Sequence, residues 1–220
     1  MTSTRRVFVE RLLDWYHENG RHALPWREDS RTAFEILVAE VLLQRTTASA
    51  VEGAYVSFVA RYPTPACLVA APSDRLVDAI EPLGLTKRAG HLERCSAQLW
   101  ERYAGRVPAE RTALLSLHGV GEYTARSVLI HAFGEHTVAV DTNVRRLVSR
   151  FFGIDPHSDA LGETADALAP EGRSGDFLHA MLDFAASVCR AREPRCDSCP
   201  LRTRCRRFES GRASRIERSQ

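Results

Sequence analysis

The sequence predicts an all-α protein, and three observations lead to this. Apolar residues recur at helical spacing along most of the 220 residues, the alternating pattern of strands is nearly absent, and proline or glycine separates the helical segments. A composition of 44% apolar and 26% charged residues is ordinary for a folded domain. The longest apolar runs, such as residues 34–39, are far shorter than the roughly 18 to 20 residues of a membrane span. We therefore expect no membrane partner.

Each predicted helix has a periodic apolar face or a clear boundary. The second helix shows the pattern best, because Phe34, Leu37, Val38, Val41 and Leu42 recur three and four positions apart. Boundaries are marked by the prolines and glycines at 63, 65, 72, 82, 84, 105 and 108, with Ser73 as a helix cap. In order, the predicted helices are 4–17, 33–46, 49–61, 73–80, 87–103, 121–133, 143–152, 161–168 and 177–189.

The charge of the chain is unevenly distributed. Of 30 basic residues only Lys87 is a lysine, so the other 29 are arginines. Residues 189–220 carry ten arginines and four acidic residues, whereas the rest of the chain has a small negative charge. A basic end favours an anionic partner such as DNA or RNA, because phosphate contacts supply most sequence-independent affinity. A solvated basic tail is the alternative.

Four cysteines follow the last predicted helix in the pattern C-x6-C-x2-C-x5-C. This segment is too polar to fold around a core of its own, so a crosslink is expected. The N-terminus leads into no signal-peptide core, which favours an intracellular protein with reduced thiols. Four thiolates can bind zinc or a [4Fe-4S] cluster, and the single C-x2-C pair favours iron-sulfur over zinc. The proposed ligands are Cys189, Cys196, Cys199 and Cys205.

A G-x-G turn at Gly119 and Gly121 lies between two helical segments. Glycines permit a tight turn with close backbone approach, and the helix that follows begins with unpaired N–H groups able to bind a phosphate. A plain turn between helices is the alternative. Twenty residues beyond Gly121, the stretch 138–146 places Asp141 at the start of a helix after an apolar run. Asp141 can be a simple N-cap, since aspartate is preferred there.

The hairpin, the V-D-T-N-V-R-R stretch and the cysteine pattern, in this order and spacing, resemble the helix-hairpin-helix (HhH-GPD) DNA glycosylases of the endonuclease III and MutY type. The resemblance runs from about residue 24 to residue 208. Residues 24–27 and 35–44 are similar to the opening of MutY-type enzymes, while 45–48 resemble the archaeal mismatch-specific thymine glycosylases.

The resemblance implies a fold of two helical lobes with duplex DNA between them. Residues 1–24 would form an N-terminal helix of the second lobe, and 25–135 a six-helix barrel with the hairpin motif at about 114–133. The second lobe would continue through 136–208 with the cluster loop at 189–205, and 209–220 would be a flexible basic tail. The implied cofactors are a [4Fe-4S] cluster and a monovalent cation at the hairpin.

The resemblance also implies roles in catalysis. Asp141 matches the aspartate that stabilises the oxocarbenium-like sugar as the base leaves. Tyr123 stands where lyase-active relatives have a Schiff-base lysine, so we expect a monofunctional N-glycosylase with little or no lyase activity. Glu40 matches the glutamate that protonates adenine in MutY-type enzymes, and its apolar neighbours should raise its pKa. The alternative for Tyr123 is a packed aromatic side chain, and for Glu40 a surface glutamate.

Further residues are implied to contact the extruded base or the DNA around it. Arg45 would fill the vacated space, Leu85 would act as a wedge, and Trp26 and Arg27 would line the base pocket. The alternative for Arg45 and Leu85 is a plain surface or core position, and for Trp26 a packing role. Asn143 would orient water or backbone near Asp141, and a helix cap is its alternative. The remaining candidates are Gln44, Ala48, Gly119, Val120, Gly121, Thr124 and His179.

The identity of the base is left open between three readings. Arg45, Ala48 and Tyr123 favour thymine or uracil opposite guanine. Adenine opposite guanine or 8-oxoguanine is the alternative, and His179 leaves room for a modified pyrimidine. Non-enzyme alternatives are an inert DNA-binding module and a zinc-stabilised binding domain, but such a module would need neither Asp141 nor Glu40. We expect a cytoplasmic, nucleoid-associated monomer that acts on double-stranded DNA containing a mispaired or damaged base and is followed by an AP endonuclease.

Overall fold

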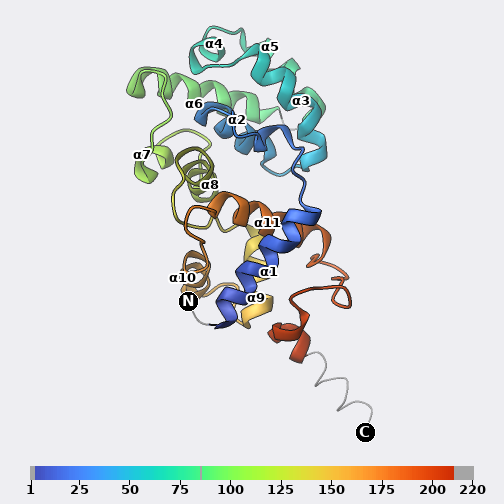
Figure 1. Cartoon of the computed structure of the whole chain (residues 1–220). Helices are drawn as coiled ribbons and strands as arrows, with labels where there is room; N and C mark the ends of the chain where they lie inside the picture. Colours follow the sequence, from blue (N-terminus) through green and yellow to red (C-terminus); the bar gives the residue numbers. More distant parts are fainter. Residues whose placement is uncertain (1–2, 85, 211–220) are drawn as a thin grey trace. The chain divides into compact units, whose positions relative to one another are not determined.

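The structure is a computed structural model that describes residues 3–84 and 86–210, and helices make up its regular elements (Figure 1). No strand occurs in these ranges, which confirms the all-α prediction. The α-helices are α1 (Ser3–Asn19), α2 (Ala33–Leu43), α3 (Ala48–Arg61), α4 (Pro65–Val69), α5 (Ser73–Ile80), α6 (Lys87–Tyr103), α7 (Arg111–Leu115), α8 (Glu122–Phe133), α9 (Thr142–Phe152), α10 (Asp159–Asp166) and α11 (Ser174–Ser187). Short 3₁₀ segments are η1 (Pro25–Arg27), η2 (Glu81–Leu83) and η3 (Arg202–Arg204).

Several helix boundaries differ from the prediction. Helices α4 and α7 were not expected, because five residues are too few to show a helical period. The last predicted helix is shifted toward the N-terminus, from 177–189 to Ser174–Ser187, and the one before it from 161–168 to Asp159–Asp166. Residues 206–210 are helical, whereas the predicted basic tail began at 209, and 211–220 lie outside the described residues.

Helix α2 ends three residues earlier than predicted. Its C-cap is Gln44, and Arg45 then takes a left-handed conformation with φ of 59°. The side chain of Thr47 accepts a hydrogen bond from Ala50 N–H and so starts α3. The residues between Leu43 and Ala48 therefore form a turn, although Thr46 had continued the helical pattern of the sequence.

The chain divides into two compact units, at residues 21/22 and 135/136. His22–Glu135 forms the central unit. The terminal unit consists of the chain up to Arg21 together with the chain from His136 onward. The resemblance placed the first boundary at 24/25 and the second at 135/136.

Helix α2 forms the centre of the central unit. It packs against α8, α3 and α6, and seven of its eleven residues are buried, Leu37 and Val38 among them. A helix that is apolar on nearly every side requires neighbours on every side. Tyr55 and Phe58 of α3 and Leu92 of α6 are buried in the same cluster.

The terminal unit joins the first helix to the last ones. Helix α1 packs against α11, and α11 packs against α9. The ring of Phe8 lies 4.7 Å from Phe151 and 6.3 Å from Phe177, measured between centroids. At the end of α1, Arg21 donates to the buried carboxylate of Asp183 through Nε at 2.8 Å and through its backbone N–H at 2.9 Å. These contacts hold the N-terminal helix against helices that lie more than 140 residues later in the sequence.

Helices of the described ranges lack the combination of length and apolar character that crossing a membrane requires.

Candidate functional site

The glycine hairpin joins α7 to α8 in the central unit. Gly119 has φ of +80°, and a Cβ there would lie 3.0 Å from the Cβ of His91. The positive φ and the closeness of His91 therefore both favour glycine at position 119. Gly121, the N-cap of α8, is extended with φ of −97°, and among the described residues nothing lies within 4 Å of a Cβ built there. Its missing side chain leaves open space in front of the N-terminus of α8, where a ligand backbone can approach.

Side chains from two other helices hold the hairpin in place. Gln98 of α6 accepts a hydrogen bond from His118 N–H at 2.6 Å, and Gln44 Nε2 donates to the carbonyl of Gly119 at 3.0 Å. Val120 and Thr124 are buried, so a contact of these residues with DNA would involve their backbone. The cation implied at the hairpin stays a prediction.

The turn after α2 is supported by a buried arginine that the sequence did not single out. Arg88 of α6 is 3% exposed. Its Nη1 donates to the carbonyls of Leu42 and, at 3.4 Å, Gln44, and its Nη2 donates to the carbonyl of Leu83 at 2.9 Å. Arg45 is exposed next to this contact, and Ala48 begins α3 as a half-buried residue. Leu85, the predicted wedge, lies outside the described residues.

Glu40 lies in the middle of α2 and is half-buried. Ser127 of α8, which is fully buried, donates its hydroxyl to Glu40 Oε1 at 2.7 Å. Because α2 and α8 pack together, this contact joins residues 87 positions apart. Tyr123 lies in the first turn of α8 and is half-buried. The surroundings of Glu40 therefore include a hydroxyl donor, which its apolar sequence neighbours did not indicate.

Asp141 is the N-cap of α9 in the terminal unit. Its Oδ1 accepts hydrogen bonds from the N–H groups of Asn143 at 2.8 Å and Val144 at 2.7 Å, and its Oδ2 accepts from Asn143 Nδ2 at 2.7 Å. The partial positive charge of a helix N-terminus also stabilises a carboxylate. The capping alternative is thus observed, and it fixes the orientation of a carboxylate that can also stabilise a positive charge.

A hydrogen-bonded chain runs from Asp141 toward the cysteine loop. Asn143 donates to Asp141 and accepts from Arg146 Nη2 at 3.0 Å. Arg146 Nε in turn donates to the carbonyl of Cys189 at 3.0 Å. Helix α9 therefore connects the predicted catalytic carboxylate to the first cysteine of the loop.

The four cysteines of the loop line one small cavity. Val188, Pro194 and Phe208 contribute apolar walls to it. All six cysteines of the chain are free thiols, and in the described part of the chain no group of three or more Cys, His, Asp or Glu side chains is arranged to hold a metal ion. Burial raises the pKa of Cys199 to about 11. The residue types suit a metal centre, and all four thiols line the same cavity.

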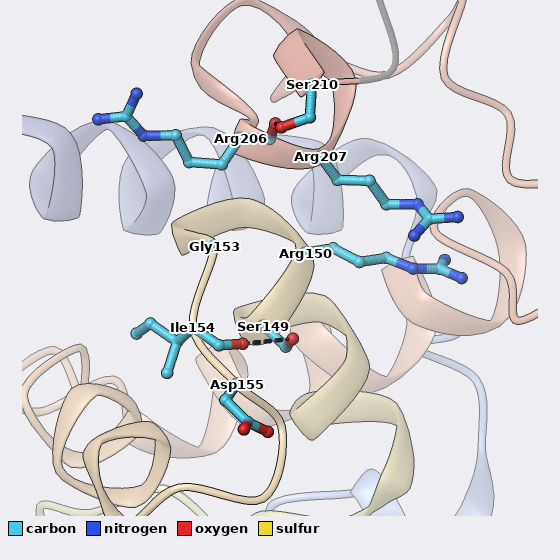
Figure 2. Close-up of a pocket in the computed structure, with 8 residues that line it drawn as sticks. All are labelled: Ser149, Arg150, Gly153, Ile154, Asp155, Arg206, Arg207 and Ser210. Atoms are coloured by element: carbon cyan, nitrogen blue, oxygen red, sulfur yellow. Dashed lines mark hydrogen bonds between the residues drawn. The ribbon is translucent and has the colours of Figure 1, made fainter. Parts of the chain in front are cut away.

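Arg150 of α9 contacts both ends of the cysteine loop. Its Nη1 donates to the carbonyl of Arg190 at 2.7 Å, and its own carbonyl accepts from Cys205 Sγ at 3.5 Å. Figure 2 shows the neighbouring pocket of about 630 Å³, in which Arg150 and Arg207 point the same way; both also line the cysteine cavity. Polar contacts to backbone carbonyls thus order a segment that has little apolar core.

Some arginines of the loop bind the protein itself. The guanidinium of Arg190 donates to the carbonyl of Glu193 at 2.7 Å, and Arg202 Nη1 donates to the carbonyl of Asp197 at 3.1 Å. The sequence had indicated a phosphate-binding role for this group of arginines. In the structure these two side chains shape the loop.

The predicted pocket residues have aromatic or charged neighbours. The ring of Trp26 packs edge to face on Tyr55 at 5.6 Å, as the packing alternative expected. Arg27 is half-buried. The pKa of His131 is lowered to about 4, mainly by burial of the imidazole and to a smaller extent by the positive charge of Arg27. His179 of α11 is half-buried, with its ring 6.4 Å from that of Tyr16.

The family described as "HhH-GPD superfamily base excision DNA repair protein" matches residues 38–169. A thymine/uracil-DNA glycosylase of Methanothermobacter thermautotrophicus is 35% identical over 93% of this chain and 95% of its own length. An adenine DNA glycosylase of Mycolicibacterium smegmatis is 37% identical over 91% of this chain and 69% of its own length. A solved non-covalent endonuclease III–DNA complex has a TM-score of 0.83 and 28% identity, covering 97% of this chain and all of the other.

Proposed function

The chain belongs to the HhH-GPD superfamily of base excision DNA repair proteins, and we propose that it removes thymine or uracil opposite guanine from duplex DNA. It is a base-excision DNA glycosylase and hydrolyses N-glycosidic bonds. DNA binding is supported by its similarity to a glycosylase solved with DNA. The observation that carries the catalytic assignment is Asp141, held at the N-terminus of α9 by three N–H donors.

The reaction follows from the chemistry of that carboxylate. As the C1′–N bond breaks, the base leaves with the bonding electron pair and positive charge develops on the sugar. The fixed negative charge of Asp141 stabilises this charge without reorganising during the step. Water then adds its hydroxyl to C1′, and its remaining proton balances the charge on the departing base. The product is an abasic site in an unbroken strand.

The choice of base rests on a few positions and on the relatives. Arg45, Ala48 and Tyr123 support thymine through the resemblance of their sequence to the thymine-specific enzymes. A thymine/uracil-DNA glycosylase is similar over almost the whole chain. Adenine is the second candidate, because Glu40 is hydrogen-bonded to Ser127 and an adenine DNA glycosylase is similarly related. A modified pyrimidine beside His179 is the third.

We also propose that the enzyme acts without a lyase step. A Schiff base requires an amine, and the one lysine of the chain, Lys87, is exposed at the first residue of α6. The position two residues after Gly121 is Tyr123. Borohydride should therefore trap no covalent adduct with DNA, and efficient trapping would overturn the monofunctional assignment. An AP endonuclease would then process the abasic product.

For the cysteine loop we propose a [4Fe-4S] cluster held by Cys189, Cys196, Cys199 and Cys205. Support comes from the shared cavity of the four thiols and from the resemblance in their spacing. When bound, the cluster would crosslink a loop that otherwise relies on arginine–carbonyl contacts. Protein purified without oxygen should contain iron and sulfide and absorb visible light. A colourless protein with one zinc per chain would favour the zinc alternative.

A panel of duplexes tests the proposed function. The duplexes carry U·G, T·G, A·G, A·8-oxoG or an oxidised or hydroxymethylated pyrimidine, and alkali treatment reveals abasic sites after incubation. We expect cleavage after alkali for U·G and T·G and much less for the others. Faster excision from A·G or A·8-oxoG would show that adenine is the preferred base. Absence of excision from every duplex would reject the proposed function.

A further inference from the structure

Three segments that the resemblance directs toward DNA meet the same helix within the central unit. They are the turn after α2 with Arg45, the turn at Leu83–Gly84 after η2, and the glycine hairpin at Gly119. Helix α6 contacts all three through side chains that the sequence analysis did not select: Arg88, His91 and Gln98.

Arg88 joins the first two segments. Its guanidinium is buried, and it donates to Leu42 and Gln44 carbonyls at the end of α2 and to the Leu83 carbonyl at the end of η2. The last carbonyls of a helix lack partners within it and carry partial negative charge, so they suit a guanidinium. Removing such a cation from water is costly unless good hydrogen bonds replace the lost hydration. The contact is therefore specific to this geometry.

Gln44 extends the connection to the third segment. Its carbonyl accepts from Arg88, and its side-chain amide donates to the Gly119 carbonyl at 3.0 Å. The order of contacts is Leu83, Arg88, Gln44 and Gly119. A shift of either turn must break at least one of these hydrogen bonds.

The backbone of Arg45 shows what this support achieves. A non-glycine residue at φ of 59° costs about 1 to 2 kcal/mol and persists where its surroundings hold it. Arg88 fixes the carbonyl of Gln44 immediately before Arg45, and the capped helix α3 begins soon after it. The direction of the Cα–Cβ bond of Arg45, from which its exposed side chain extends, is therefore set by the turn.

We propose that Arg88 is a positioning residue for base extrusion. It holds the turn of Arg45 and the Leu83–Gly84 turn, which precedes the predicted wedge Leu85 in the sequence, at one separation so that the two segments act on the duplex together. This inference rests on the proposed function, because it assumes that the enzyme extrudes a mispaired base and fills the vacated space. Arg88 itself is buried and acts through the two turns.

The proposal distinguishes paired from unpaired substrates. A base that is still stacked in a duplex must be extruded and the gap filled, whereas a base in a bubble of unpaired nucleotides is already accessible. A loss of turn positioning should therefore slow excision from a duplex much more than excision from a bubble. A loss of folding would slow both equally.

The experiment compares Arg88→Met and Arg88→Lys with a matched control, Arg94→Met. Arg94 lies on the same helix, is exposed, and its Nε donates to the carbonyl of Gly90 in that helix at 3.2 Å. Two measurements are made on each protein: fluorescence of 2-aminopurine beside a mispaired thymine, which reports unstacking, and single-turnover excision of uracil from a U·G duplex and from a bubble.

We expect Arg88→Met to lose most of the fluorescence change and to slow duplex excision about 100-fold, with bubble excision within about threefold of wild type. Arg88→Lys should recover part of both losses, since an ammonium reaches fewer carbonyls. Arg94→Met should match wild type. Equal slowing on duplex and bubble, or an Arg88→Met protein that behaves like Arg94→Met, would overturn the proposal.

If Arg88→Met does not fold, Gln44→Met replaces it, because this variant breaks only the contact with Gly119. We expect Gln44→Met to reduce the fluorescence change. An unchanged fluorescence change would contradict the proposed connection. If wild-type protein excises neither thymine nor uracil, the proposed function fails. The same variants are then compared on whichever duplex of the panel wild-type protein processes, and equal unstacking by Arg88→Met and wild type there would reject the positioning role.

Discussion

Asp141 in the terminal unit and Glu40 in the central unit, the two predicted catalytic carboxylates, are held in opposite ways. Asp141 accepts its hydrogen bonds from Asn143 and Val144, residues within three positions along the chain. Glu40 accepts from Ser127, 87 positions away on another helix. The geometry of Asp141 is therefore set by the local chain at a helix start, and that of Glu40 depends on how α2 packs against α8. Substitutions should affect the two sites differently.

The largest effect is expected at the locally held carboxylate. Asp141→Asn removes the charge, while asparagine remains a good N-cap, so α9 should be retained. Excision of the preferred base should fall at least about 1,000-fold, with the Kd for duplex within about threefold of wild type. Single-turnover excision and equilibrium binding measure this. The control is Asp159→Asn, which neutralises an exposed carboxylate in the first turn of α10. A wild-type rate in Asp141→Asn would refute the catalytic assignment.

A smaller and substrate-dependent effect is expected at Glu40. Glu40→Gln removes a proton donor that adenine needs for departure more than thymine does. Excision of adenine from A·G should fall about 100-fold and that of thymine from T·G less than threefold. The rates are compared on both duplexes, with Glu52→Gln on the exposed face of α3 as control. Equal losses on both duplexes would mean that Glu40 acts on the sugar or on folding.

Ser127→Ala tests whether the long-range contact matters. Loss of the hydrogen bond that orients Glu40 Oε1 should slow adenine excision about tenfold. Ser57→Ala is the control, because the Ser57 hydroxyl donates within its own helix, to the carbonyl of Ala54 in α3. In the double variant with Glu40→Gln, the Ser127→Ala effect should disappear. Additive effects in this cycle would show that Ser127 acts independently of Glu40.

The smallest effect concerns stability in the central unit. The pKa of His131 is lowered from 6.5 to about 4, mainly by burial. The unfolded chain therefore binds this proton first as pH falls, so the stability that neutral His131 contributes is present above pH 6.5 and is lost progressively between about 6.5 and 4. Between pH 7 and pH 5 the loss should be about 2 kcal/mol. Urea unfolding at both pH values should show a smaller pH difference for His131→Gln than for wild type. If the pH difference in unfolding free energy were the same for His131→Gln and wild type, the pKa of His131 would not be lowered by burial.

The hairpin and the Asp141 cap were predictable because each depends on a few consecutive residues. Gly119 indicates a turn, and an aspartate before a periodic segment indicates the start of a helix. The end of α2 was misjudged because Thr46 continues the pattern, whereas the left-handed Arg45 stops the helix. Sequence periodicity carries no information on where a backbone turns left-handed.

Arg88 shows what kind of signal a sequence can hold for a missed residue. It falls in register with Leu92, Cys95 and Leu99, all buried on one face of α6. An arginine on an apolar stripe indicates a buried guanidinium that must find acceptors. Its acceptors, the carbonyls near the ends of α2 and η2, could not be named without the structure.

The sequence by itself determined the longer helices, the glycine hairpin, the carboxylate at the start of α9 and the four cysteines, because each depends on hydrogen bonds or spacing within a few turns of chain. The tertiary structure alone decided that Ser127 meets Glu40, that Arg88 joins two turns, and that Arg146 and Arg150 bind the cysteine loop. These contacts depend on which helix faces pack together, and packing is set by the whole apolar core rather than by any one segment.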